Sequence, residues 1–327
     1  MQGHAVVRKG CLLVICCLIL SFSIACTACS SKSEAKNSSS KKSSSSKGTK
    51  KEAPRDNTPQ VLIPQASGST VYTGDVVSID ASNTAEGYVM VQYNGSNEKV
   101  KFQVKTPDGK DYTYLVTQYG EYEVYPLPGG SGAYTLTLLE SASIEDDLYA
   151  ISFTQDVDVA ITNEFTPFLY PNKYVDFNEG TNAVKKGKSL AKDCYSDLDV
   201  VTKIYNYVIK TIKYDTPKAE KVPYGYTPDV DETLSTKKGI CFDYAAVMSC
   251  MLRTQKIPTK LEVGYVGDIY HAWISCYVDE IGWVDNIIEF DGKNWSLMDP
   301  TLAANNKSSD VKKYIGDGSK YVVKYTY

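Results

Sequence analysis

Three side chains in the second half of the sequence could together perform nucleophilic catalysis. Cys241 follows Gly239 and Ile240 at the expected start of a helix, where unpaired N–H groups and the helix dipole favour an anionic thiolate of depressed pKa. His271 follows in a His-Ala-Trp segment, and Asp299 lies closer to the C-terminus in an Asp-Pro-Thr segment. A cysteine nucleophile needs a base to take its proton and a group to orient that base. The pattern therefore predicts Cys241 as nucleophile, His271 as base and acid, and Asp299 as the group that orients the imidazole.

One helix and an antiparallel sheet must position these side chains. Apolar residues recur at helical spacing from Cys241 until Pro258 ends the helix, and residues 259–266 and 269–278 read as two strands of a hairpin. Period-two alternation puts His271 and Trp273 on one face of the second strand. Residues 196–215 predict a further helix, and 283–288 and 295–299 further strands. This order favours an α+β domain over residues 166–327.

Other interpretations of Cys241 are core packing or a disulfide bond. Cys250 lies further along the same expected helix, about 13 Å away, so the two cannot be bridged. Cys194 and Cys276 remain formal partners. No CxxC spacing occurs in the folded part of the chain, so neither a zinc site nor a disulfide framework is indicated. Apart from His4, near the N-terminus, His271 is the one histidine in the sequence.

Residues 60–165 predict an all-β domain. Short runs of β-branched and aromatic residues alternate with turn segments such as TPDGK at 106–110. Several short strands in about 100 residues favour a β-sandwich of immunoglobulin-like or jelly-roll type. No group of residues in this domain has the types and spacing of a catalytic site. Its tyrosines are either ordinary strand residues or a binding surface for protein or carbohydrate.

Residues 1–29 predict an export signal. Arg8 and Lys9 precede an apolar run at 11–26 that is too short to span a bilayer comfortably. The run ends in SIACTACSSK, which resembles the lipobox of bacterial lipoproteins and marks Cys29, or alternatively Cys26, for lipidation. The resemblance implies a protein anchored to the bacterial cell membrane and facing outside the cytoplasm. The alternative is a plainly secreted protein.

Residues 30–59 predict a disordered tether, since they are rich in Ser and Lys and contain no large apolar residue. The tether carries eight basic and three acidic residues, while the whole chain has a net charge of −4. The folded part is therefore acidic, which argues against nucleic acid as a partner.

The segment GICFDYAAVMSCMLRTQKIPTKLEVGYV, followed by YHAWISCYV and MDPT, closely resembles the transglutaminase-like core, over about residues 195–302. The resemblance implies a rearranged papain-like fold in which Cys241, His271 and Asp299 form the triad. It makes Tyr244 a core residue and places an oxyanion-assisting side chain upstream of the cysteine, for which Tyr224 and Tyr226 are candidates. Trp273, beside His271, is a further candidate substrate contact. Since no calcium-site pattern occurs, no metal or cofactor is expected.

The resemblance leaves the reaction open. Members of this superfamily include proteases, amidases and protein cross-linkers, so the expected substrate is a protein or peptide amide attacked through a thioester intermediate. The competing hypothesis is a non-catalytic surface protein that uses the core and the sandwich as binding modules, with cell-wall or surface polymer as a further partner.

Overall fold

The N-terminal part of the protein forms two antiparallel sheets of four strands each. The computed structural model describes residues 53–143, 147–279, 281–285, 288–290, 295–297 and 321–327. The sheets have the strand orders β1-β2-β3-β6 and β5-β4-β7-β8. The strands are β1 (Val71–Thr73), β2 (Val77–Asp80), β3 (Tyr88–Tyr93), β4 (Val100–Lys105), β5 (Asp111–Leu115), β6 (Tyr122–Pro126), β7 (Gly132–Ser143) and β8 (Leu148–Val159), with a 3-10 turn at Thr84–Glu86.

The two sheets pack face to face as a sandwich because their strands alternate. In β4 the side chains of Val100, Phe102 and Val104 are buried, while the intervening residues are not. Aromatic rings join the sheets, with the centroid of Phe102 4.7 Å from that of Tyr125 on β6. The predicted β-rich N-terminal region is therefore confirmed.

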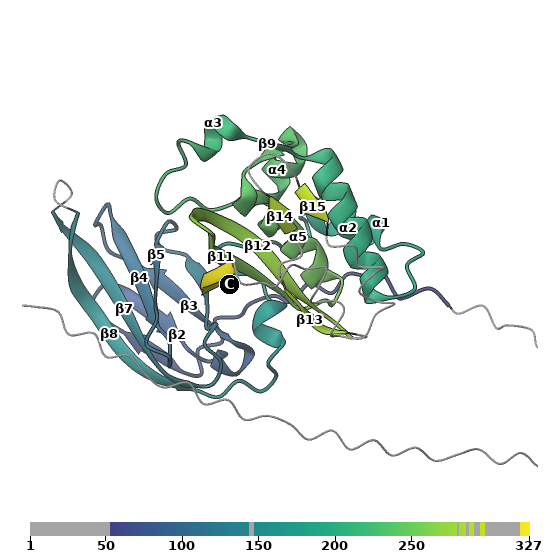
Figure 1. The fold of residues 1–327 in the computed structure, drawn as a ribbon. Coiled ribbons are helices and arrows are strands. Elements are labelled where there is room, and N and C mark those ends of the chain that lie inside the picture. The colour runs from purple at the N-terminus through teal and green to yellow at the C-terminus, as the bar shows by residue number, and fades with distance from the viewer. Residues whose placement is uncertain (1–52, 144–146, 280, 286–287, 291–294, 298–320) are drawn as a thin grey trace, which may run out of the picture. The chain divides into compact units, whose positions relative to one another are not determined.

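The C-terminal part combines helices with a third antiparallel sheet of order β13-β12-β11-β16. Figure 1 shows this sheet between the sandwich and the helices. The elements are a 3-10 turn (Thr166–Phe168), α1 (Asn182–Leu190), α2 (Asp197–Thr211), β9 (Lys213–Tyr214), α3 (Thr216–Ala219), α4 (Val230–Thr236), β10 (Lys238–Gly239), α5 (Cys241–Thr254), β11 (Thr259–Val266), β12 (Ile269–Val278), β13 (Gly282–Val284), β14 (Ile288–Phe290), β15 (Trp295–Leu297) and β16 (Tyr321–Thr326). The predicted α+β class is confirmed, including the two long helices and the hairpin.

Local sequence explains where the long helices begin and end. The Ser196 hydroxyl accepts the N–H of Asp199, whose carboxylate in turn accepts the N–H of Ser196, so a capping box starts α2. Helix α5 is buried from Asp243 to Thr254 and packs on β11 and β12. A helix buried on all sides draws its stability from packing more than from propensity, which fits its Ala- and Met-rich sequence.

Residues 53–59 depart from the predicted tether. They have no regular secondary structure, yet the Arg55 guanidinium lies 2.5 Å from the Asp197 carboxylate and donates to the main-chain oxygen of Gln255 just after α5. The residue thereby supplies a partner for a carbonyl beyond the last turn of a helix. The prediction of disorder rested on composition, which shows that this segment has few apolar residues. Composition cannot show that one arginine makes specific contacts with the folded part. The described residues from 53 onward belong to one compact unit.

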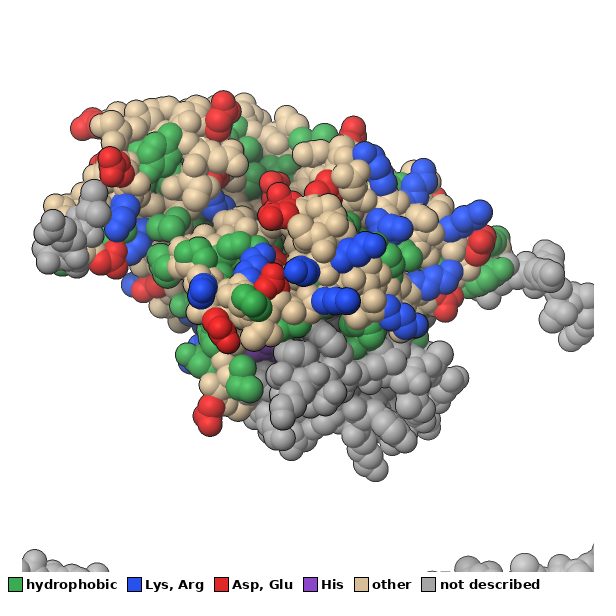
Figure 2. Space-filling model, turned by 90° about the horizontal axis from the view of Figure 1, so that it is seen from above, with side chains coloured by type: hydrophobic (Ala, Val, Ile, Leu, Met, Phe, Trp, Pro, Cys, Tyr) green, Lys and Arg blue, Asp and Glu red, His purple; other side chains and the backbone are tan. Residues whose placement is uncertain are grey.

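The exposed faces of α1 and α2 are rich in lysine. Figure 2 shows Lys and Arg side chains gathered over the side of the molecule on which these helices lie. They include Lys185 and Lys188 on α1 and Lys203 and Lys210 on α2.

Of the helices in the described ranges, none combines the length and the apolar character needed to cross a bilayer.

Arg253 joins the end of α5 to three other segments. Its exposed fraction is 1%, and its guanidinium donates to the main-chain oxygens of Thr259, Tyr170 and Tyr327 at 2.7–3.0 Å. Burial lowers its pKa to about 9. The residue therefore links α5 to the third sheet and to the segment around Tyr170 that follows the sandwich.

Replacing Arg253 by Met tests this role. Three main-chain oxygens would each lose one hydrogen bond from a buried guanidinium, so we expect the free energy of unfolding to fall by about 3 kcal/mol. Urea denaturation measures the change, and Lys256→Met, which removes an exposed ion pair with Asp56, should change it by less than about 1 kcal/mol. Equal stability of the Arg253 variant and the wild type would contradict the assignment.

Candidate active site

The buried carboxylate of Asp243 fixes the start of α5. It accepts hydrogen bonds from the N–H of Ile240 (2.8 Å), the hydroxyl of Tyr226 (2.5 Å) and the ammonium of Lys218 (2.8 Å). Asp243 has no exposed surface. A carboxylate in the first turn complements the helix dipole and satisfies an otherwise unpaired N–H. Three donors from three segments therefore determine where the helix begins, and so where Cys241 lies.

Cys241 begins the helix that packs on β12. Among the described strands, β13 pairs with the edge of β12 that faces away from β11, and it does so at residues 276–278. The backbone N–H groups of Ala272 on β12 and of Phe242 lie near enough to Cys241 to lower the pKa of its thiol. Ala272 lies in the hydrophobic core, and by alternation the side chain of His271 lies on the opposite face of the strand. The thiol thus sits at the strand edge, next to the residue that carries the imidazole.

Cys241 and His271 line one cavity of about 730 Å³, the size of an ordinary ligand site. Among the described residues that line it, no side chain carries a formal charge at neutral pH. Its walls are largely aromatic: Tyr174, Tyr214, Tyr224, Tyr226, Phe242, Tyr270, Tyr325 and Tyr327. Tyr224 and Tyr270 are the exposed aromatics among them, so they lie at the mouth. The cavity suits an uncharged side chain or an extended peptide.

Burial keeps both reactive groups neutral. It raises the pKa of the Cys241 thiol above the ordinary value, although the N–H groups of Ala272 and Phe242 act in the opposite direction. The expected depressed pKa is therefore wrong for this arrangement, because desolvation outweighs the helix N-terminus. Burial also lowers the pKa of His271 to about 4. The site pairs a thiol with a neutral imidazole that can accept its proton.

One nitrogen of His271 has no hydrogen-bond partner in the part of the chain that the structure describes. The residue has an exposed fraction of 5%, and Nε2 is buried without a hydrogen bond to the described residues. A buried polar atom of this kind normally has a partner. Asp299, the predicted orienting group, lies outside the described residues. Its contact with His271 therefore stays a prediction, and the Nε2 atom marks the position where such a partner would bind.

The three aromatic candidates occupy different positions. Tyr224 lies at the mouth of the cavity with an exposed fraction of 68%. Tyr226 lines the cavity, but its hydroxyl proton is committed to Asp243. Burial and this bond raise its pKa, so it acts as a link and not as a free oxyanion donor.

Trp273 is not among the residues that line the cavity. It is fully buried, its indole N–H donates to Glu262 at 2.9 Å, and its ring stacks near His271 with a centroid separation of 6.3 Å. The interpretation as a substrate contact is corrected to a supporting role beside the imidazole.

Sequence reasoning missed the contributions of Lys218 and of the sandwich. Lys218 completes the Asp243 network, and only the aspartate within the quoted CFDYAA motif could have signalled it. Thr113 of β5 lines the cavity. Gly225, at a positive φ of 75°, packs so tightly on Leu115 of β5 that a Cβ would lie 2.2 Å from its side chain. The sandwich therefore forms one wall and supports the tyrosine segment.

The four described cysteines are free thiols, and Cys241 is the one that is not fully buried. Helix geometry thus correctly excluded a Cys241–Cys250 bridge. Within the described ranges, no three His, Cys, Asp or Glu side chains are grouped so as to hold a metal ion. The expectation of no metal stays a prediction. The lipidation candidates Cys26 and Cys29 lie outside the described residues.

Comparison with known proteins supports the family resemblance of this region. Residues 185–286 match the family model of the transglutaminase-like superfamily. The chain is also similar to the UPF0252 protein MJ1282 of Methanocaldococcus jannaschii, with 26% identity over 253 residues that span 69% of each chain.

Two solved structures are similar to the protein. One is a candidate cysteine protease from Cytophaga hutchinsonii, with a TM-score of 0.34 and 13% identity over 79% of this chain and 73% of that one. The other is a candidate protease from Parabacteroides distasonis, with a TM-score of 0.29 and 14% identity over 62% and 61% of the two chains.

The unpaired Nε2 atom gives a direct test of Asp299. Apart from His4, which falls in the predicted export signal, His271 is the one histidine of the chain, so its imidazole C2–H signal can be titrated by NMR. Burial alone sets the pKa of His271 at about 4, and a carboxylate on Nε2 would raise it. We therefore expect Asp299→Asn to lower the pKa by a unit or more, towards 4.

Asp279→Asn, which changes an exposed carboxylate, is the matched control and should leave the titration in place. Identical His271 pKa values in the wild type and Asp299→Asn would remove Asp299 from the site. Since protonation is disfavoured in the folded state, the His271 contribution to the free energy of unfolding should also fall as pH drops from 6.5 towards 4.

Proposed function

We propose that this chain, whose residues 185–286 form a transglutaminase-like domain, is a cysteine-dependent enzyme that transfers or hydrolyses the acyl group of protein or peptide amides. The observation that carries the proposal is that Cys241, at the start of a buried helix, and His271 line one cavity, in which the described side chains carry no formal charge. Thiol, imidazole and neutral substrate can meet there with water largely displaced.

The reaction follows from the groups present. The Cys241 sulfur attacks the amide carbon while the neutral imidazole of His271 takes the thiol proton. Backbone N–H groups at the start of α5 are available to the developing oxyanion. The imidazolium then gives its proton to the leaving ammonia or amine, and a thioester remains. Water or a second amine, deprotonated by His271, attacks the thioester and releases the thiol.

Asp299 is proposed as the partner of Nε2, since it would stabilise the imidazolium that forms during attack. Its role matters here because burial disfavours that cation. The buried environment that makes the site neutral at rest would otherwise also raise the barrier to proton transfer.

A non-catalytic binding role is the second candidate, and one observation favours it. A raised thiol pKa and a lowered imidazole pKa both oppose the thiolate–imidazolium form. A scaffold protein could use the same aromatic cavity to hold a peptide without reaction.

The activity test separates these outcomes. The full chain is incubated with a glutamine-containing protein and a biotinylated amine, and mass spectrometry distinguishes amine incorporation, deamidation and backbone cleavage. Cys241→Ala should reduce whichever reaction occurs by about 10³-fold or more, because it removes the nucleophile.

Cys194→Ala, which removes a buried thiol, is the matched control and should retain activity. Absence of all three modifications, or equal turnover by Cys241→Ala and the wild type, would leave only the binding role.

We also propose that the enzyme acts at the outer surface of a bacterial membrane, held there by a lipid on Cys29. The support is the SIACTACSSK segment and the Ser/Lys-rich sequence after it. Cys29→Ser should release the protein from the membrane fraction into the medium, as immunoblotting of fractionated cells would show. Cys26→Ser is the control, and release by that variant alone would move the lipid to Cys26.

A further inference from the structure

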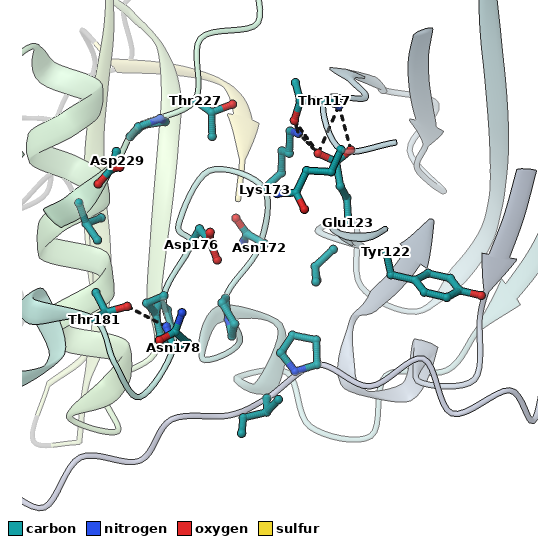
Figure 3. Close-up of a pocket in the computed structure, with 18 of the residues that line it drawn as sticks. Thr117, Tyr122, Glu123, Asn172, Lys173, Asp176, Asn178, Thr181, Thr227 and Asp229 are labelled. Atoms are coloured by element: carbon teal, nitrogen blue, oxygen red, sulfur yellow. Dashed lines mark hydrogen bonds and ion pairs between the residues drawn. The ribbon is translucent and has the colours of Figure 1, made fainter. Parts of the chain in front are cut away.

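A second cavity, of about 640 Å³, lies away from Cys241 and His271. Its walls come from the sandwich, from the 171–181 segment and from the 227–231 segment that leads into α4. Figure 3 shows Asp176 and Asn172 between Thr227 and Asp229 on one side and Glu123 and Lys173 on the other. The cavity is large enough for a ligand the size of a short peptide.

One pair of charges in this cavity is internally satisfied. Glu123 forms an ion pair with Lys173, and both bind the hydroxyl of Thr117 (Figure 3). Glu123 also accepts the hydroxyl proton of Tyr125 at 2.6 Å. Neither member of the pair is left without a counter-charge, so the pair serves as a fixed wall.

Three further carboxylates, Asp176, Asp229 and Asp231, line the same cavity. Asp229 and Asp231 cap α4 and α1 through backbone N–H groups, and Asp176 feels the charge of Lys173, which is already paired with Glu123. No Lys or Arg of the described residues forms an ion pair with any of the three. Asp176 and Asp229 both line this cavity and are drawn together in Figure 3. Burial and the charge of Asp229 raise the pKa of Asp176, while Lys173 acts in the opposite direction. The cavity thus has an excess of negative charge.

Asn172 supplies an independent sign of a ligand. Its exposed fraction is 4%, and its Nδ2 group has no hydrogen-bond partner among the described residues. The orientation of the amide is fixed, because Oδ1 accepts the N–H groups of Tyr174 and Val175. Nδ2 is therefore a buried donor of a residue on the cavity wall, and it has no acceptor among the described residues.

We propose that this cavity binds a lysine side chain of a peptide, with the ammonium between Asp176 and Asp229 and a peptide carbonyl on Nδ2 of Asn172. A lysine-bearing peptide offers both groups that the cavity lacks, a cation and an acceptor. A free diamine offers only the cation. A bound ammonium group stabilises the ionised form of both carboxylates. Asp176 is exposed on one side, so the lysine side chain can enter the cavity there.

The position of this cavity relates it to the first one. Residues 224–226 line the cavity of Cys241, and residues 227–231 line the acidic cavity. One continuous segment therefore forms a wall of each. A peptide held by its lysine in the acidic cavity would run along this segment, which makes the site a recognition site for basic peptides separate from the reacting groups.

Calorimetry on the full chain tests the proposal with three ligands: Nα-acetyl-lysine amide, Nα-acetyl-norleucine amide and 1,5-diaminopentane. The norleucine compound has a similar apolar chain without the ammonium, so it should bind at least tenfold more weakly than the lysine compound. Asp176→Asn should weaken the lysine compound at least tenfold, and Asp229→Asn, which keeps a capping side chain, should do likewise.

Asp158→Asn, an exposed carboxylate on β8, is the matched control and should change affinity less than twofold. Weaker binding of diaminopentane than of the lysine compound supports a peptide as the source. Equal binding identifies free amines as the source and retains the ammonium site. The proposal is overturned if the norleucine compound binds as well as the lysine compound, if Asp176→Asn binds like the wild type, or if neither amine binds saturably.

These measurements are independent of the proposed activity. Repeating them with Cys241→Ala should give the same affinities, because the nucleophile does not line the acidic cavity. Lysine binding without turnover would therefore support the acidic cavity as a binding site and contradict the proposed enzymatic activity. Turnover without lysine binding would support the activity and contradict the binding site.

Discussion

The buried carboxylate of Asp243 is the interaction on which the candidate site depends. It binds the N–H at the start of α5, the hydroxyl of Tyr226 and the ammonium of Lys218. A fully buried carboxylate is unfavourable in free energy unless such donors surround it. Separating the three segments would therefore destabilise the folded state. The same contacts that start the helix therefore place Cys241 at the edge of β12 and hold the tyrosine segment over the cavity.

Burial of this site has two consequences that oppose each other. It favours a neutral thiol and a neutral imidazole, which lowers the fraction of thiolate available for attack. It also strengthens every dipole and hydrogen bond that acts on the charges formed in the transition state. The N–H groups of Ala272 and Phe242 act to lower the pKa of the Cys241 thiol, so they favour the negative charge that would develop on the sulfur.

The β-sandwich has a definite structural part in this arrangement. Thr113 of β5 reaches the cavity wall, and Leu115 receives the backbone of Gly225 at a distance that only glycine permits. The other sheet of the sandwich supplies Glu123 on β6, whose ion pair with Lys173 forms part of the wall of the acidic cavity. Both cavities thus depend on how the sandwich packs against the segments at 171–181 and 222–231.

The sequence by itself determined the α+β class, the helix beginning at Cys241, the hairpin carrying His271 and the family resemblance, because periodicity and motif spacing are local properties of the chain. Only the tertiary structure decided that Tyr226 serves Asp243, that Trp273 serves Glu262, that Arg55 packs against α2, and that burial overrides the helix dipole at Cys241. Each of these depends on which distant groups surround a side chain and how much water is excluded, and no spacing along the chain encodes that directly.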